Sequence, residues 1–246
     1  MQTFYLTDAG KVRSHNEDSV TIINNDKDEY ILAVADGMGG HKAGEVASSI
    51  AIEHITDEFY KLETIGTKED AIEWLREKVN EINNKIFKYT HEHPESKGMG
   101  TTLVIAIKTN DYILFGNIGD SSGYVIKNDK LHKVTHDHTL VNLLVTTGEL
   151  TEEEAKYHPR KNVLMRALGA NDPIEIDIFD VDMTVKGIFL CSDGLTNMIT
   201  DEQIEKILNS DASIEDMVVK LIRKSNSRGG TDNISIAYLK KESGDL

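Results

Sequence analysis

The sequence predicts an α+β fold in which antiparallel sheets are covered by helices, and three observations support this class. Short apolar runs that end in glycine or aspartate recur along the chain, as is typical of buried strands. Longer segments carry apolar residues at helical spacing and come in two pairs. The expected strands stand in consecutive blocks and do not alternate with helices, which favours antiparallel sheets over a doubly wound parallel sheet.

Length, β-branched content and the turn residues that follow identify the individual strands. The clearest run covers residues 30–35 and ends at Asp36-Gly37. The remaining runs cover residues 20–23, 101–107, 112–118, 187–191 and 234–239. Asn110-Asp111 and Asn128-Asp129 separate neighbouring runs, as hairpin turns do.

Residues 43–60 and 69–89 are expected to form the first helix pair, and a second pair follows Asp201 over 204–208 and 214–222. The segment 146–162 is polar, contains Gly and Pro, and is long for a plain connection, which predicts a flap or binding loop. Neither an internal repeat nor a linker is evident. The sequence therefore predicts one domain spanning residues 1–246.

Charge and cysteine content narrow the partners and the compartment. With 27 Lys+Arg against 42 Asp+Glu, the formal charge is −15, which disfavours nucleic acid and anionic membrane surfaces. The single cysteine, Cys191, predicts a reducing compartment. The sequence shows neither a signal peptide nor an apolar stretch of about 18 residues, so we expect a cytoplasmic protein without membrane insertion. No oligomerisation signal is evident, so we expect a monomer.

Carboxylates stand at the ends of several expected strands, beside glycine or a small polar residue. They are Asp36, Asp120, Asp193 and Asp232, with Glu17-Asp18 just before the run 20–23. If these strand ends meet, divalent cations must offset the repulsion, and oxygen ligands suit Mg²⁺ or Mn²⁺. Taken singly, an aspartate after a strand is also typical of a turn or helix cap.

Arg13 lies near the first carboxylate pair, and a guanidinium binds phosphate oxygens through two parallel hydrogen bonds. Two divalent ions about 3.5–4 Å apart can activate a shared water and stabilise phosphoryl transfer. The residues alone therefore indicate a plausible metal site and no more.

An ordered series of motifs resembles a known family. The series is Arg13-x-x-Asn16-Glu17-Asp18, Asp36-Gly37-Met38-Gly39-Gly40-His41, Gly44-x-x-Ala47-Ser48, Gly98-Met99-Gly100-Thr101-Thr102, Gly119-Asp120-Ser121, Asp137-His138, Cys191-Ser192-Asp193-Gly194-Leu195 and Gly230-Thr231-Asp232-Asn233. It resembles the bacterial branch of the metal-dependent protein serine/threonine phosphatases, the protein phosphatase 2C family, from about residue 5 to residue 240. The resemblance implies a four-layer αββα sandwich of two antiparallel β-sheets flanked by helix pairs.

The resemblance also implies metal-binding roles. By the family pattern, Asp36 bridges two ions and the Gly37 carbonyl joins it on one of them. Asp193 and Asp232 hold the other ion, and Asp120 with Asp193 matches a third, weaker position. The ions would be Mn²⁺ or Mg²⁺.

Further family roles fall on the N-terminal motif and on the polar segment. Asp18 and Glu17 would act on the metals directly or through ligand water. Arg13 matches the phosphate-binding arginine. The segment 146–162 falls where the family carries a mobile flap.

The chain departs from the family pattern at two positions. Ser122 stands where an arginine often follows Gly-Asp-Ser, and we expect a local or flap-related effect there without loss of chemistry. Met38 stands where some members place a histidine as a candidate general acid. His41 is near in sequence and is the candidate proton donor here, with water as the alternative.

The function that the resemblance implies is metal-dependent hydrolysis of phosphoserine and phosphothreonine in phosphoproteins by a metal-bridging water. The implied partner is a bacterial membrane serine/threonine kinase that this activity opposes. The alternative is a catalytically inactive phosphate-binding or scaffold protein on the same fold. That alternative predicts the loss of Asp36, Asp193 or Asp232, and all three are present.

Other chemistries fit the sequence poorly. Cys191 lacks the arginine that a thiolate phosphatase needs six residues later, where Asn197 stands, so we expect a buried apolar cysteine. Asp180-Val181-Asp182 resembles an aspartyl-phosphate motif but leads straight into another strand. His136-x-His138 lacks further zinc ligands nearby, which favours a solvated loop.

Overall fold

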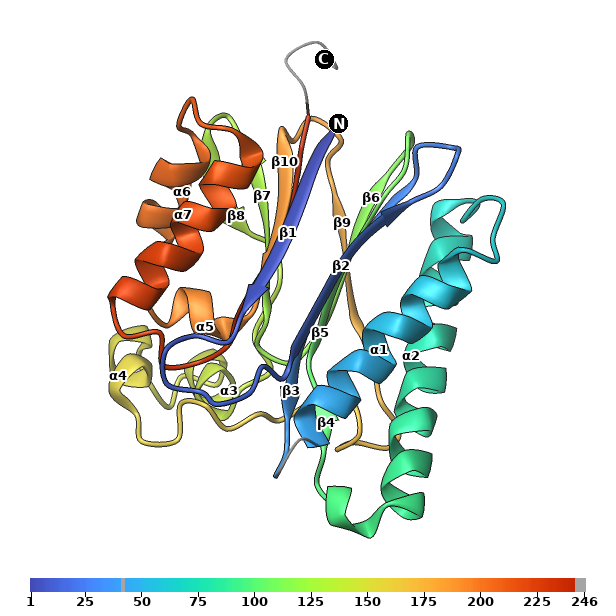
Figure 1. Cartoon of the computed structure of the whole chain (residues 1–246), viewed down its shortest axis with the longest axis vertical. Coiled ribbons are helices and arrows are strands. Elements are labelled where there is room, and N and C mark those ends of the chain that lie inside the picture. The colour runs from blue at the N-terminus through green and yellow to red at the C-terminus, as the bar shows by residue number, and fades with distance from the viewer. Residues whose placement is uncertain (41–42, 242–246) are drawn as a thin grey trace.

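The computed structural model describes residues 1–40 and 43–241. Two antiparallel sheets lie face to face, and a pair of helices covers the outer face of each (Figure 1). These four layers confirm the αββα sandwich that the motifs predict. The N-terminus lies at the end of the sandwich opposite β4 and the short helices α3 and α4.

The first sheet joins strands from both ends of the chain. In sheet order its strands are β1 (Gln2–Asp8), β11 (Ile234–Lys240), β10 (Gly187–Cys191), β7 (Ser122–Lys127) and β8 (Lys130–Lys133). Its outer face is covered by α6 (Asp201–Leu208) and α7 (Ile214–Ser227). The short helix α5 (Asp193–Thr196) follows β10 directly.

The second sheet is built mostly from the first half of the chain. Its order is β2 (Asp18–Asn24), β3 (Tyr30–Met38), β5 (Leu103–Lys108), β6 (Ile113–Ile118) and β9 (Asp177–Val181), with β4 (Gly100–Thr101) paired to the end of β3. Helices α1 (Ala43–Phe59) and α2 (Lys68–Glu92) cover it, and the 3₁₀ turn η1 (Pro94–Ser96) follows α2. A reciprocal Thr67–Asp70 capping box starts α2.

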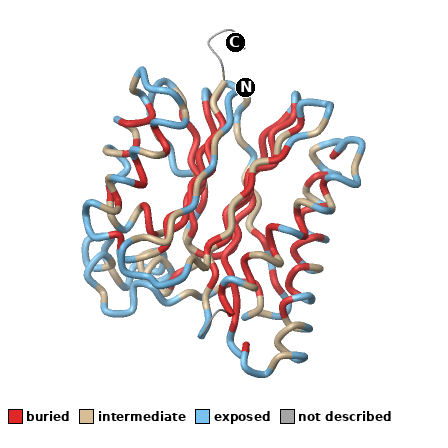
Figure 2. Tube along the Cα trace, in the orientation of Figure 1, coloured by how far each residue is buried: buried red, intermediate tan, exposed pale blue. Residues whose placement is uncertain are grey.

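The position of strand β3 explains why residues 30–35 are continuously apolar. Ile31, Ala33 and Ala35 pack under α1 and α2, whereas Leu32 and Val34 pack between the two sheets. Both faces of β3 are therefore buried, and strand periodicity directs alternate side chains to the two layers. Figure 2 shows the same pattern for the chain, with buried strands inside and exposure on the outer surfaces of the helices.

The expected helices and most central strands are confirmed within a few residues, but the buried strand β7 and the edge strands β1, β8 and β9 are not among the apolar runs. In β7 the residues Ser122 and Gly123 interrupt the apolar pattern, although both are buried. The side chains of the three edge strands are largely exposed or half-buried, so their apolar signal is weak. The predicted flap segment contains α4 (Glu152–Tyr157), and α3 (Leu140–Thr146) precedes it. The loops Asn110-Asp111 and Asn128-Asp129 do join paired strands.

Candidate active site

Five carboxylates from distant parts of the chain meet at one end of the space between the sheets. Asp36 continues the β3 face of Leu32 and Val34, and Asp18 stands opposite it as its cross-strand partner. The others come from the turn after β6, the start of α5 and the loop before β11; they are Asp120, Asp193 and Asp232. Antiparallel topology brings these chain reversals to the same edge.

Asn233 fastens three chain segments at this end. Its Oδ1 accepts a 2.8 Å hydrogen bond from the Glu17 amide, and its Nδ2 donates to the carbonyls of Ala9 and His15. The loop that carries Arg13 is thereby tied to the loop that carries Asp232. Asn233 belongs to a motif that the sequence analysis named, but its clamping role had no sequence signal.

The backbone around Asp36 and Gly37 is equally constrained. The Asp36 amide donates to the Thr102 hydroxyl at 2.9 Å, and the Gly37 amide donates to the Glu17 carbonyl at 3.1 Å. A Cβ on Gly37 would lie 2.1 Å from the Gly44 carbonyl oxygen. Glycine is therefore required by close backbone approach at this position.

The carboxylates shift one another's titration. The pKa values of Asp18 and Asp120 are raised to about 7, chiefly by burial and in part by the charge of nearby Asp193. Burial, followed by the charge of Asp18, raises the pKa of Asp36 well above its ordinary value. Burial raises the pKa values of Asp193 and Glu17 too. The cluster therefore lacks enough positive charge to hold every carboxylate ionised.

Two carboxylate oxygens of this cluster have no hydrogen-bond partner among the described residues. They are Asp18 Oδ1 and Asp193 Oδ1, and both are fully buried. Their second oxygens accept hydrogen bonds, Asp18 Oδ2 from the Ser192 hydroxyl at 2.8 Å and Asp193 Oδ2 from the side-chain Nδ2 of Asn197 at 2.9 Å. Unpartnered buried anionic oxygens beside other carboxylates fit hard divalent cations such as Mg²⁺ or Mn²⁺.

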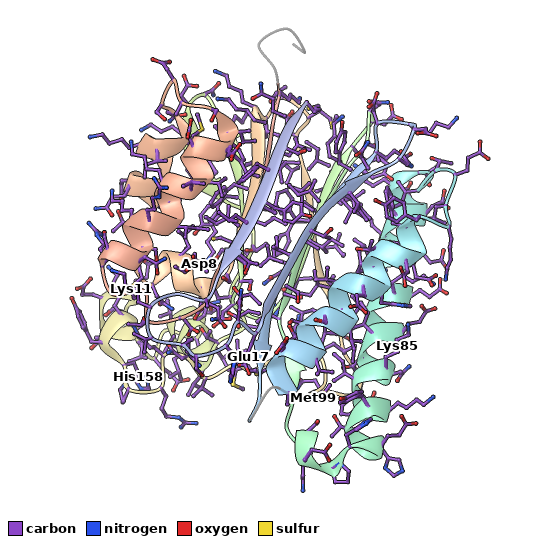
Figure 3. The ribbon with its side chains drawn as sticks, viewed as in Figure 1. Asp8, Lys11, Glu17, Lys85, Met99 and His158 are labelled. Atoms are coloured by element: carbon purple, nitrogen blue, oxygen red, sulfur yellow. The ribbon has the colours of Figure 1, made fainter. Side chains whose placement is uncertain are left out.

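A cleft of about 560 Å³ opens over the cluster. The residues that line it include Arg13, Glu17, Asp36, Gly37, Asp120, Asp193 and Asp232, together with several residues between 162 and 171. Figure 3 shows Glu17 at this lower end of the sheets. Asp18 is the cross-strand partner of Asp36 but is not among the residues that line this cleft.

Arg13 supplies a cation at the cleft. It is half-exposed, and its NH2 donates to Asp232 Oδ2 at 2.8 Å. His41, the predicted proton donor, lies outside the described residues. Ser122 is buried at the start of β7, two residues after Asp120.

A second group of possible ligands lies between α1 and α2. The ligand atoms of His54, Glu58 and Glu81 are within 4.8 Å of one another. Lys78 binds both glutamates and Lys85 contacts His54 Nδ1, so lysines already balance these charges. Figure 3 places Lys85 on the outer helical layer, away from Glu17.

The structure also tests the alternative roles considered for Cys191, Asp180 and the two histidines His136 and His138. Cys191 is fully buried and burial raises its pKa, as expected of an apolar residue without nucleophilic character. Asp180 lies on edge strand β9, which pairs antiparallel with β6 and opens no βαβ unit. The expectation of a solvated loop at His136 and His138 is wrong for His138, whose side chain is only 10% exposed.

Comparison with known proteins places this geometry in a family. The family model described as Protein phosphatase 2C matches residues 9–234. The chain belongs to the protein phosphatase 2C family. It is 41% identical over 243 residues to the serine/threonine phosphatase stp of Listeria monocytogenes, covering 98% of this chain and 96% of that protein. It is 36% identical to the protein phosphatase PhpP of Streptococcus pneumoniae, covering 97% of each.

Solved structures agree with this assignment. The S. agalactiae serine/threonine phosphatase is similar with a TM-score of 0.93 and 33% identity, covering 98% of this chain and 99% of that one. This member of the protein phosphatase 2C family is a protein serine/threonine phosphatase. The family is metal-dependent. None of the helices in the described ranges is long and apolar enough to cross a membrane.

Proposed function

We propose that the chain hydrolyses phosphoserine and phosphothreonine in phosphoproteins at the carboxylate cleft. One observation carries the proposal. Carboxylates with raised pKa values and unpartnered buried oxygens surround a cleft whose rim holds an arginine. That combination suits a metal-dependent phosphoester hydrolase, because cations neutralise the carboxylates and the arginine binds the phosphate.

The residues that would hold the ions are Asp36 with the Gly37 carbonyl, Asp193 and Asp232, with Asp120 at a weaker third position and Asp18 and Glu17 in support. When bound, Mn²⁺ or Mg²⁺ supplies an activated water for direct attack on phosphorus and neutralises charge on the phosphate. The unpartnered oxygen of Asp193 and the cleft position of Asp36 support this assignment. Asp18, the cross-strand partner of Asp36, would support it, and the Ser192 hydroxyl binds its second oxygen.

Arg13 would orient the phosphate. Its guanidinium already donates to Asp232 through NH2, and the half-exposed side chain can reach a bound phosphate from the cleft rim. The proton for the leaving alkoxide would come from His41 or from water, and this part stays a prediction.

The wider role follows the family pattern. We infer one catalytic domain over residues 1–246 with a flap at about 146–162. We expect a cytoplasmic monomer that acts on phosphoproteins, including a membrane serine/threonine kinase. The names of the relatives support phosphatase activity and do not favour the scaffold alternative.

The proposal is tested by phosphate release from a phosphothreonine peptide. We expect activity with Mn²⁺ or Mg²⁺, its loss in EDTA and its return when Mn²⁺ is added back in excess. The physical reason is that the carboxylates repel one another and cannot activate water alone. A folded protein that releases no phosphate with either metal would favour the scaffold alternative, and full activity in EDTA would exclude the metal mechanism.

Replacing Arg13 with alanine is expected to raise KM about tenfold with a smaller effect on kcat, because a charged hydrogen bond to substrate phosphate is lost. Steady-state kinetics with the same peptide measure both constants. Lys11 lies on the same loop and is labelled in Figure 3, so Lys11→Ala is the matched control for lost positive charge. If both variants raise KM equally, Arg13 has no specific phosphate contact.

A further inference from the structure

The side chain of His138 is nearly buried and has no role in the proposed hydrolysis. It lies in the loop between β8 and α3, and its side chain is 10% exposed. Its surroundings are the turn after β6, the start of β9 and the cleft residue Arg166. The first of these carries Asp120, so the contacts of His138 bear on the candidate metal site.

Backbone and side chain of His138 together hold Gly119. The His138 amide donates to the Gly119 carbonyl at 2.9 Å, and the Gly119 amide donates to Nδ1 of the imidazole at 3.1 Å. Gly119 has a φ of +101°, a conformation that glycine adopts readily and other residues rarely do. Asp120 is the next residue.

The hydrogen bonds define the tautomer of the ring. Because Nδ1 accepts from the Gly119 amide, the proton of a neutral imidazole must be on Nε2. Nε2 lies 3.0 Å from Asp177 Oδ2 and donates to it. Arg166 NH1 donates to the other oxygen of Asp177, so the carboxylate accepts from both side chains.

This chain of contacts connects the cleft wall to the Asp120 turn. Arg166 lines the cleft, and the Met165 amide beside it donates to the His138 carbonyl at 2.8 Å. Among the charged side chains near Asp120, Asp193 has the strongest electrostatic effect on it. A displaced imidazole would therefore change the position of Asp120 relative to Asp193.

We propose that His138 is a positioning residue whose Nδ1 holds the Gly119–Asp120 turn so that Asp120 faces Asp193 and supports the weakest-bound divalent ion. The inference rests on the proposed function, because it assumes that Asp120 holds an ion. Residues that orient metal ligands typically change metal affinity about 10–100-fold when they are replaced.

Two substitutions of His138 test the roles of its two ring nitrogens separately. Asparagine places Oδ1 near the position of Nδ1 and can accept from the Gly119 amide. Glutamine carries its amide one methylene farther, near Nε2 and Asp177. In calorimetric titrations of the metal-free full chain with Mn²⁺ alone, we expect His138→Gln to weaken the weakest binding step about tenfold or more, and His138→Asn to affect it much less. Equal effects, or the reverse order, would overturn the proposal.

A double-mutant cycle distinguishes positioning from a general structural role. In an Asp120→Asn background, His138→Gln is expected to cause no further weakening of Mn²⁺ binding, because its target is already altered. Thermal unfolding in EDTA reports on the fold separately. A similar loss of affinity in both backgrounds would show that His138 acts on the whole fold and would overturn the proposal.

His136→Asn is the matched control, because His136 is exposed and its ring contacts Phe179 instead of the Asp120 turn. It should leave the titration unchanged. If the wild-type chain binds no Mn²⁺, or if Asp120→Asn leaves its weakest step unchanged, the metal assignment fails and this inference with it. If only His138→Gln behaves like wild type, this inference fails and the proposed function stands.

Discussion

Replacing Asp193 with alanine is expected to lower kcat about 10³-fold or more while the protein stays folded. Loss of a metal ligand removes several kcal/mol of transition-state stabilisation, and each 1.4 kcal/mol lowers the rate about tenfold. Asp193 has a raised pKa, caused first by burial and then by the charge of Asp232. Its removal relieves repulsion in the metal-free state, so we expect no lower melting temperature in EDTA.

Phosphate release and thermal unfolding of the same preparation check this prediction. Asp111→Ala is the matched control, because Asp111 is an exposed aspartate in the β5–β6 turn. It should change both readouts little, since surface substitutions usually stay within about 0.5 kcal/mol. Wild-type turnover in Asp193→Ala would end the assignment of Asp193 to the metal site.

Replacing Gly37 with alanine is expected to destabilise the protein by about 3 kcal/mol, at the upper end of the range for overpacking. The added methyl would lie 2.1 Å from the Gly44 carbonyl oxygen and 2.5 Å from that of Glu17. Both neighbours are backbone atoms, so neither can rotate away. We expect a melting temperature lower by about 6–12 °C for a chain of this length.

Gly40→Ala tests whether the effect belongs to the site or to any glycine of the loop. A Cβ on Gly40 meets no atom of the described residues within 4 Å. Denaturant unfolding of both variants should therefore show a large loss of stability for Gly37→Ala and little change for Gly40→Ala. Equal stability of the two variants would contradict the packing argument.

Part of the candidate site could be predicted from the sequence because its residues occur in ordered motifs. Asp36, Asp193 and Asp232 were predicted from their places at strand ends, and the structure brings them to one cleft. The sequence did not indicate that Asp18 belongs to the cluster without lining that cleft. The pairing of β2 with β3 places Asp18 opposite Asp36, and the hydroxyl of Ser192, 174 residues away in sequence and directly after β10, binds the carboxylate of Asp18.

His138 is a second residue whose role could not be predicted from the sequence. Its spacing from His136 resembles a ligand pair, and only the tertiary contacts show that one ring is exposed while the other holds Gly119. Hydrogen bonds between loops far apart in sequence have no periodic signature, whereas helices and buried strands do.

The sequence by itself determined the fold class, the helix pairs, most of the central strands and the oxygen-rich chemistry of the site. These depend on local periodicity and on residue type. Only the tertiary structure decided which carboxylates line the cleft, which oxygens lack partners and which side chains hold the turns in place. The reason is physical: charge repulsion, burial and loop anchoring depend on distances between segments, and the packing of the two sheets sets those distances.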